Sequence, residues 1–160
     1  MTDKLSPGAW SAHIRSAWAS RVRPEAIVLD DYEPDTPDEW DALHIQQWLA
    51  GKTYDEIVGT SEIDHEILFD YLTDDACAYF LGAYLLEVSQ VLDRSGGSDF
   101  AVNHFSFFVR DKRFRVVVEL LSEAQRTVLF QLILAMLGER WAFDLDDEAI
   151  AGLEMAATLV

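Results

Sequence analysis

The sequence predicts an all-α protein in which about six helices pack as a single compact bundle around a central apolar helix at residues 73–93. Helix-start signals recur along the chain, and between them apolar residues recur at intervals of three and four. Apolar residues make up 50% of the composition, which is too many for a disordered chain. At 160 residues, the chain is long enough for one core and is expected to form one acidic domain, residues 1–160.

Helix starts are recognised by a Ser or Thr cap with Glu or Gln three residues later, because the two side chains satisfy backbone N–H groups that lack helical partners. Three segments have this capping box: Thr36–Glu39, Thr53–Glu56 and Ser122–Gln125. Pro37 follows the first cap, at a position where its missing N–H is not needed. Two further starts are predicted, at Ser61 with Asp64 and at Thr73 before two aspartates.

Apolar side chains then mark the helical faces. Helical stripes are predicted in three segments: Trp10, Ile14, Ala17 and Trp18; Trp40, Leu43, Trp48 and Leu49; and Ile63, Ile67, Leu68 and Tyr71. The segment 73–93, with Leu81, Tyr84 and Leu85 near its middle, is apolar on nearly every face, which is typical of a helix buried at the centre. A second long helix is predicted from Ser122 to about Gly138, and a short one from near Asp146.

Two segments lack a clear helical pattern. Residues 94–99 are rich in Gly and Ser and are predicted to form a flexible loop within the domain. Residues 105–118 alternate apolar and basic runs, so the sequence leaves open a helix or irregular structure on one side and a small β-hairpin on the other.

A cytoplasmic location is expected. Cys77 is the only cysteine, which excludes an internal disulfide and a zinc site built from several thiols. Its apolar setting predicts a packed thiol with a raised pKa. The first eight residues lack the pattern of a signal peptide. The apolar run 132–137 has six residues, against about 18 for a membrane span, so no contact with a membrane is expected.

Negative charge is concentrated in the middle of the chain. The formal net charge is -17, and residues 24–93 contain 18 Asp and Glu but only one base, Lys52. Such a field repels nucleic acid and anionic membranes and accelerates encounters with basic partners. A charged surface that serves only solubility is the alternative interpretation.

The acidic residues themselves are the candidate partner-binding site. Glu62, Glu66 and Asp70 recur every four residues, which would align three like charges on one helix face at a cost of a few tenths of a kcal/mol per pair. Five other acids close in sequence are expected to extend them into one patch: Asp38, Glu39, Asp41, Asp55 and Glu56.

No catalytic residue, metal site or cofactor is predicted. Glu62 and His65 have the Glu-x-x-His spacing of di-iron bundles, but such a site needs a second copy that the sequence lacks. Single histidines at 13, 44 and 104 are not accompanied by a nucleophile motif or a phosphate-binding loop. Four bases fall within residues 110–115, where an internal clamp onto the acidic half, or a loop of solvated charge, is favoured over nucleic-acid binding because of the overall negative field.

Residues 71–86 resemble a family signature. They share Leu72-Thr73, Ala76, Tyr79, Leu81 and Ala83-Tyr84 with the pattern Leu-Thr-Pro-Glu-Ala-Phe...Tyr-Leu-Pro-Ala-Tyr of an uncharacterised bacterial protein family. Residues 120–126 resemble its second motif, and the similarity covers roughly residues 36–138. Asp74 and Gly82 depart from the pattern, since the family has Pro there. The resemblance implies a helical fold and, because the family has no assigned activity, no catalytic residue.

The sequence favours a non-enzymatic protein that binds a basic protein partner. The most concrete form of this hypothesis is an immunity-type inhibitor that masks a basic bacterial toxin through the acidic face. An uncharacterised cytosolic scaffold or regulatory interaction protein is the alternative, and a small enzyme using His65 with neighbouring carboxylates is the third. The partner's identity and the oligomeric state are not fixed by the sequence.

Overall fold

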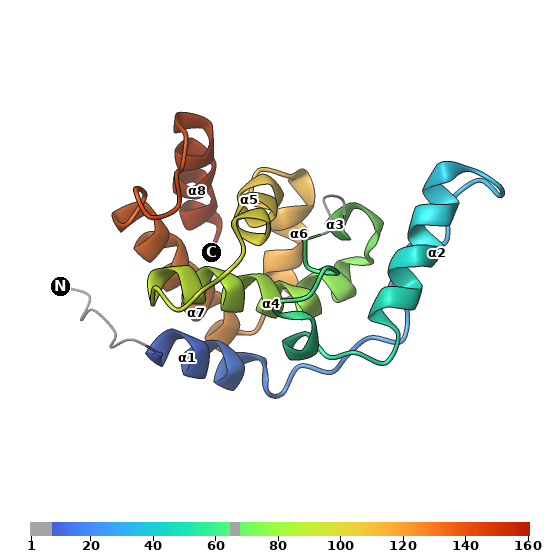
Figure 1. Ribbon diagram of the computed structural model, residues 1–160, viewed down its shortest axis with the longest axis horizontal. Coiled ribbons are helices and arrows are strands. Elements are labelled where there is room, and N and C mark those ends of the chain that lie inside the picture. The colour runs from blue at the N-terminus through green and yellow to red at the C-terminus, as the bar shows by residue number, and fades with distance from the viewer. Residues whose placement is uncertain (1–7, 65–67) are drawn as a thin grey trace.

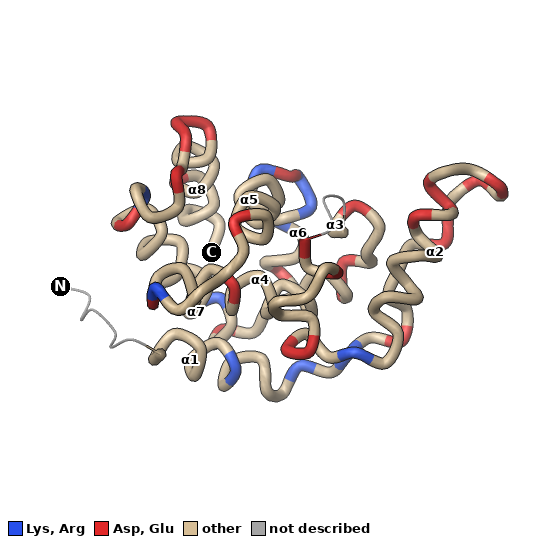
Figure 2. The backbone as a smooth tube through the Cα atoms, in the orientation of Figure 1, with Lys and Arg blue, Asp and Glu red and all other residues tan. Residues whose placement is uncertain are grey.

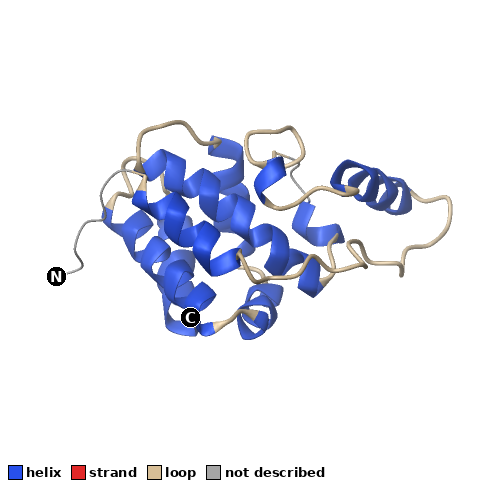
Figure 3. Ribbon diagram, turned by 90° about the horizontal axis from the view of Figure 1, so that it is seen from below, coloured by secondary structure: helices blue, strands red, loops and turns tan. Residues whose placement is uncertain are grey.

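The computed structural model describes residues 8–64 and 68–160, and over these ranges the protein is all-α, as predicted (Figure 1). One 3-10 helix, η1 (Asp55–Ile57), lies between α2 and α3. The α-helices are α1 (Ala9–Trp18), α2 (Pro37–Leu49), α3 (Leu68–Tyr71), α4 (Asp74–Leu92), α5 (Asp99–Phe108), α6 (Lys112–Leu120), α7 (Glu123–Gly138) and α8 (Asp147–Leu159). Extended pairing among the described residues is limited to one isolated bridge between Val28 and Leu72 (Figure 3).

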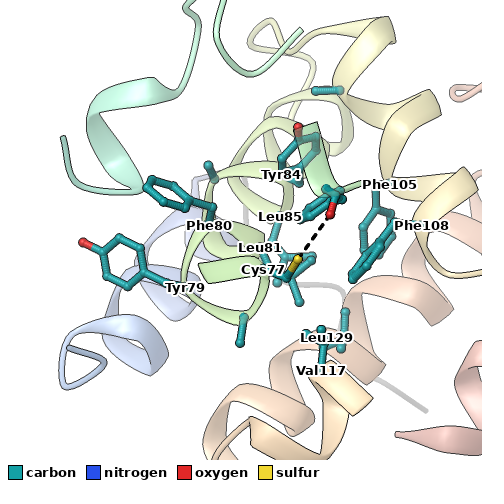
Figure 4. Packing of buried hydrophobic residues seen from close by; sticks show 14 of the residues in the cluster. Cys77, Tyr79, Phe80, Leu81, Tyr84, Leu85, Phe105, Phe108, Val117 and Leu129 are labelled. Atoms are coloured by element: carbon teal, nitrogen blue, oxygen red, sulfur yellow. Dashed lines mark hydrogen bonds between the residues drawn. The ribbon is translucent and has the colours of Figure 1, made fainter. Parts of the chain in front are cut away.

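The predicted central helix is confirmed as α4. Every residue from Ala76 to Ser89 is buried. Helices α1, α5, α6, α7 and η1 all contact α4, and Figure 4 shows its buried side chains projecting in every direction around the axis. The hydrophobic effect therefore acts on all sides of one helix, which organises the bundle.

Side-chain caps fix where the main helices begin. Thr73 Oγ1 accepts the N–H of Ala76 at 3.2 Å and so starts α4 at the predicted place. Ser122 and Gln125 form the complete capping box predicted for α7. Both signals are local in sequence and depend little on tertiary packing, which explains why they are predictive.

Helix α1 approaches α4 at a glycine. Trp18 Nε1 donates to the carbonyl oxygen of Ala78 at 3.1 Å. A Cβ atom on Gly82 would lie 2.9 Å from Trp18 Cδ1 and 3.0 Å from Tyr54 Cδ2, closer than ordinary packing allows. Gly82 therefore leaves space for the Trp18 ring, and α4 continues through this position without interruption.

The hairpin considered for residues 105–118 is wrong. Residues 105–108 end α5, and α6 begins at Lys112. Asp111 caps α6 by accepting the N–H of Arg113 at 2.7 Å. Phe114, Val117 and Val118 are buried at helical spacing, so burial on one face selects a helix despite the β-branched residues.

Two predicted helix starts also do not produce α-helices. Only half of the Thr53–Glu56 box forms: Glu56 Oε2 accepts the Thr53 N–H at 2.7 Å, whereas the Glu56 N–H bonds to the Thr53 carbonyl oxygen and not to its hydroxyl, and the segment opens only the single turn of η1. Ser61 and Asp64 lie in turns, so no helix runs from Glu62 to Asp70. Tertiary contacts decide this segment, because Ile57 and Ile63 are fully buried and Gly59 N–H donates to the Glu87 carboxylate at 2.6 Å.

Helix α2 lies at one end of the molecule, beside α3 (Figure 1, Figure 3). Its inner face is buried through Ala42, Ile45 and Leu49. Over the described ranges, no helix has both the length and the apolar character needed to cross a membrane.

The central position of α4 predicts a large effect of truncation there. Leu85 is fully buried, so Leu85→Ala is expected to lower the free energy of unfolding by about 2–5 kcal/mol, through lost burial and the cavity left behind. Urea denaturation measures this. Leu43→Ala serves as the control, because Leu43 is 49% exposed and its truncation is expected to change stability by less than about 0.5 kcal/mol. Equal effects of the two changes would contradict the assigned packing.

Candidate functional site

The predicted acidic residues that the structure describes lie on several separate elements. Seven of the eight lie in the described ranges, and Glu66, with His65, lies outside them. Because Glu62 is in a turn and Asp70 is in α3, they do not share a helix face. The remaining acids divide into three groups: those bound to local partners, those at the start of α2, and Asp70 at a cavity.

Three of the acids take part in contacts within the fold. The Asp55 carboxylate receives two hydrogen bonds from the Arg15 guanidinium, at 3.0 and 3.1 Å. Glu62 forms an ion pair with Lys52, which lowers the pKa of the Glu62 carboxyl. Glu56 closes the turn at Thr53, and the hydrogen bonds it accepts there lower its pKa. Their contacts support the fold more directly than they support a partner site.

The acids at the start of α2 remain at the surface. Residues 30–41 contain seven Asp and Glu and no base, and Figure 2 shows them gathered on the end of α2 and the loop before it. Among the described residues, none of the seven forms an ion pair with Lys or Arg. Asp38 and Asp41 instead accept hydrogen bonds from the Tyr71 hydroxyl, at 3.3 and 3.4 Å. Burial and these two carboxylates raise the pKa of Tyr71 to about 12.

The outer face of α2 adds exposed apolar area beside these acids. This outer face, as the term is used below, comprises residues spaced at i, i+3, i+4 and i+7: Trp40, Leu43, His44 and Gln47. Trp40 is 59% exposed. The centroids of the His44 and Trp48 rings lie 4.5 Å apart, and this contact restricts the orientation of the His44 side chain. A large exposed aromatic residue on a helix is typical of a protein-binding surface.

The second candidate site is a cavity of about 220 Å³ where α3, α4 and α5 meet. Aromatic rings form much of its wall. Phe69 stacks on Phe108 with centroids 4.1 Å apart and also contacts Tyr84, at 4.5 Å. Phe107, which is 63% exposed, lies at the same cavity.

Residues with polar side chains line this cavity from four elements. Asp70 lies in α3, Tyr84 in α4, His104 in α5, and Asp111 at the cap of α6. Burial raises the pKa of the Asp70 carboxyl, the nearby negative charge of Asp111 adds to that rise, and Arg113 opposes it. Asp70 and Asp111 are both exposed residues, and the negative charge of Asp111 disfavours that of Asp70.

Tyr84 is the unusual residue of the cavity. It is fully buried, and within the described part of the chain its hydroxyl has no hydrogen-bond partner. Burial raises its pKa well above the ordinary value. Figure 4 shows its ring on the side of α4 away from Leu129 and Val117. A buried hydroxyl without a partner costs stability, so its presence needs an explanation.

Arg113 satisfies other groups beside the cavity. Its guanidinium donates to Asp74 Oδ1, at 2.8 and 3.0 Å, and to the carbonyl oxygens of Phe69 and Leu72. Of the two alternatives that the sequence leaves open for the basic run, Arg113 forms the internal clamp onto the acidic half, whereas Arg115 is exposed. Arg113 is therefore engaged by the α3–α4 junction, and no ion pair of Asp70 or Asp111 with Lys or Arg occurs in the described ranges.

Cys77 is packed as predicted. Its thiol donates to the carbonyl oxygen of Phe69 at 3.7 Å (Figure 4), and burial raises its pKa to about 12. Within residues 8–64 and 68–160, no three His, Cys, Asp or Glu side chains come together as metal ligands. The His65 arrangement considered above lies partly outside those ranges.

Sequence reasoning identified the acids at α2 and Asp70, but it missed the cavity. Tyr84 was assigned to the core because it lies on an apolar helix, and Asp111 lies 41 positions beyond Asp70. A tyrosine on a helix that is apolar on every face was the available signal, because its hydroxyl needs a partner wherever it is buried. Comparisons with family models, with characterised proteins and with solved structures find no match to this chain.

The unpartnered hydroxyl makes Tyr84→Phe a stabilising change. Removing a buried hydroxyl that has no hydrogen bond is expected to raise the free energy of unfolding by about 1 kcal/mol, measured by urea denaturation. Tyr71→Phe is the matched control. It removes a hydroxyl that donates to two carboxylates, so it is expected to lower stability by about 1 kcal/mol. Destabilisation by Tyr84→Phe would show that this hydroxyl is hydrogen-bonded.

The raised pKa of Asp70 predicts a pH-dependent effect of Asp70→Asn. The folded state binds the Asp70 proton more tightly than the unfolded chain does, so wild-type stability decreases as pH rises through the raised pKa. The variant lacks this loss and is expected to have the higher Tm at pH 7. The difference should shrink as pH falls and vanish below about pH 4, where the aspartate is also protonated in the unfolded chain.

Thermal unfolding between pH 4 and 7 measures this difference in Tm. Glu154→Gln, at an exposed position on α8, is the control and should give a difference that changes little with pH. An Asp70→Asn variant that is less stable than wild type at pH 7 would contradict the assignment.

Proposed function

We propose that this is a non-enzymatic protein that binds a basic protein partner through α2. The observation that carries the proposal is the combination on one helix of exposed Trp40 and Leu43 with the acidic segment 30–41, which contains no base. In its most concrete form, the partner is a basic bacterial toxin such as a nuclease, whose active surface the protein masks as an immunity-type inhibitor.

The two parts of this surface have different roles in binding. The acidic segment attracts a basic partner over distances of about a Debye length and orients it before contact. The outer face of α2 then supplies anchors at i, i+3, i+4 and i+7, the spacing used when a helix enters a groove on its partner. Trp40 is the expected energetic centre, because tryptophan is enriched among the residues that dominate binding energy.

The role of the inner face is to hold the helix in place. Ile45 and Leu49 are fully buried, and Arg23 donates to the carbonyl oxygens of Leu49 and Lys52 at 2.8 and 2.9 Å. These contacts satisfy carbonyl groups at the end of α2 that would otherwise lack partners. Because α2 is already formed, binding does not require it to fold at the same time, which favours affinity.

The first test uses Trp40→Ala. The partner is isolated from the native cells on the immobilised wild-type protein, and the affinities of purified variants are measured by calorimetry. Truncation of Trp40 is expected to weaken binding at least about 30-fold, equivalent to about 2 kcal/mol. Trp141→Ala is the matched control, because Trp141 is 91% exposed and lies outside α2, and its effect should be less than about threefold. Similar losses in both variants would contradict a specific role of α2.

A second test separates charge from contact. Asp38→Asn with Asp41→Asn removes two negative charges, while the amide oxygens can still accept from the Tyr71 hydroxyl. Stopped-flow association with the same partner is expected to slow at low salt and to become less dependent on ionic strength. The dissociation rate should change little. An association rate that is equal to that of the wild type at 0.05 M salt would assign the acidic segment to solubility.

A further inference from the structure

The first turn of α2, residues 37–41, carries Trp40 but contains no buried residue. The buried residues of α2 begin at Ala42 and end at Leu49. Arg23 also acts at that far end, where it donates to the Leu49 carbonyl oxygen at 2.8 Å. Leu49 lies about 14 Å from Trp40 along the helix axis. Apolar packing therefore fixes the end of α2 more firmly than the turn that carries Trp40.

The Tyr71 hydroxyl connects this turn to the rest of the protein. It donates to Asp38 Oδ1 and Asp41 Oδ2, which lie 3.3 and 3.4 Å away. Within residues 8–64 and 68–160, no other hydrogen bond or ion pair joins residues 37–41 to an element beyond α2 and the loop before it. A phenol donates one proton, so the hydroxyl bonds to one carboxylate at a time and has the other as an alternative acceptor.

These two bonds bear on the direction of Trp40. Asp38 and Asp41 lie three positions apart and so share the side of α2 that faces Tyr71. At 3.6 residues per turn, Trp40 lies about 130° around the helix from the middle of that side. Contact of the acids with Tyr71 therefore directs Trp40 away from the fold, where it is 59% exposed. Asp38 is itself exposed, so its charge still reaches solvent.

Tyr71 is fixed in place by its own surroundings. Its side chain is buried, and its carbonyl oxygen accepts the N–H of Leu29 at 2.8 Å. On either side of it in the chain, the carbonyl oxygens of Phe69 and Leu72 accept from the Arg113 guanidinium at 2.7 and 2.6 Å. A residue that orients a binding group must be firmly held itself, and Tyr71 meets this condition.

We infer that Tyr71 is a positioning residue of the proposed binding surface: its hydroxyl holds the first turn of α2 so that Trp40 is presented outward before a basic partner arrives. This inference rests on the proposed function. Without the hydroxyl, Asp38 and Asp41 repel each other and the turn has no bond to α3. The cap at Thr36 is local and remains, so the turn stays helical but is no longer oriented. Ordering it on binding would then cost affinity.

The first test needs no partner. Order parameters of the backbone amides of residues 38–41 are measured by nitrogen-15 relaxation, where rigid backbone gives about 0.85 and flexible backbone less than about 0.6. Tyr71→Phe is expected to lower these values from the rigid toward the flexible range and to leave those of residues 45–49 unchanged. Ser122→Ala, which removes the cap of another helix, α7, should leave both sets unchanged. Unchanged order parameters in Tyr71→Phe would overturn the inference.

A second variant removes the acceptors in place of the donor. Asp38→Ala with Asp41→Ala should lower the same order parameters to the same degree, and Tyr71→Phe added to this pair should have no further effect. Thermal unfolding establishes that each variant is folded. Additive effects of donor and acceptors would show that Tyr71 acts on the turn by another route, and the inference would be wrong.

Binding is then measured with the basic protein isolated on the immobilised wild-type protein, as above. Tyr71→Phe is expected to weaken binding about tenfold, because the turn must be ordered on binding. In the Trp40→Ala background the same change should weaken binding less than about twofold, because Tyr71 acts through Trp40. Ser122→Ala should bind as the wild type does. An equal loss in Ser122→Ala would reduce the effect to general stability and overturn the inference.

The outcomes separate this inference from the proposed function. If Trp40→Ala binds as the wild type does, the proposed function is wrong and this inference with it. If Trp40→Ala weakens binding but Tyr71→Phe does not, the inference alone is wrong. The same holds if Tyr71→Phe keeps its full effect on binding in the Trp40→Ala background.

Discussion

The structure depends on the complete burial of α4. Because every residue from Ala76 to Ser89 is buried, a polar group on this helix that is not satisfied within the helix needs a partner from another element. The Ala78 carbonyl accepts from Trp18 Nε1, the Glu87 carboxylate accepts from Gly59 N–H, and Ser89 contacts Ser11. These bonds fix α1 and the turns after η1 in specific positions, whereas apolar contact alone would allow them to slide. Tyr84 is the exception on this helix, and that exception marks the cavity.

Arg113 connects the core to the cavity. By donating to the carbonyl oxygens of Phe69 and Leu72 and to Asp74, it joins α6 to the junction between α3 and α4. The positive charge of the Arg113 guanidinium also lowers the pKa of Asp70. It only partly offsets the rise that burial and Asp111 cause. A structural clamp thus leaves two carboxylates without a basic ion-pair partner in the described part of the chain.

The sequence predicted the parts of the fold that local signals determine. The bounds of α4 and α7 followed from the caps at Thr73 and Ser122 and from apolar spacing. The helix predicted from Ser61 to Asp64 is wrong, because these residues form turns whose long-range contacts no local pattern reveals: Asp64 accepts a hydrogen bond from the Ser98 hydroxyl, and Glu87 accepts the N–H of the neighbouring Gly59. Composition reveals the acidic segment before α2, because its residues are close together in the sequence. The cavity could not be predicted in this way. Its groups come from four elements and meet only after the bundle has formed.

The position of each acid relative to the bases distinguishes structural from binding roles better than net charge does. Asp55 and Glu62 have basic partners, so their charges are largely offset within the fold and add little to an external field. The seven acids of residues 30–41 have no such partners in the described ranges, and their mutual repulsion destabilises the free protein. A basic partner that covers these acids would relieve the repulsion, and it would do so only in the complex. The proposed binding through α2 therefore rests on an arrangement of charges that is unfavourable in the free protein.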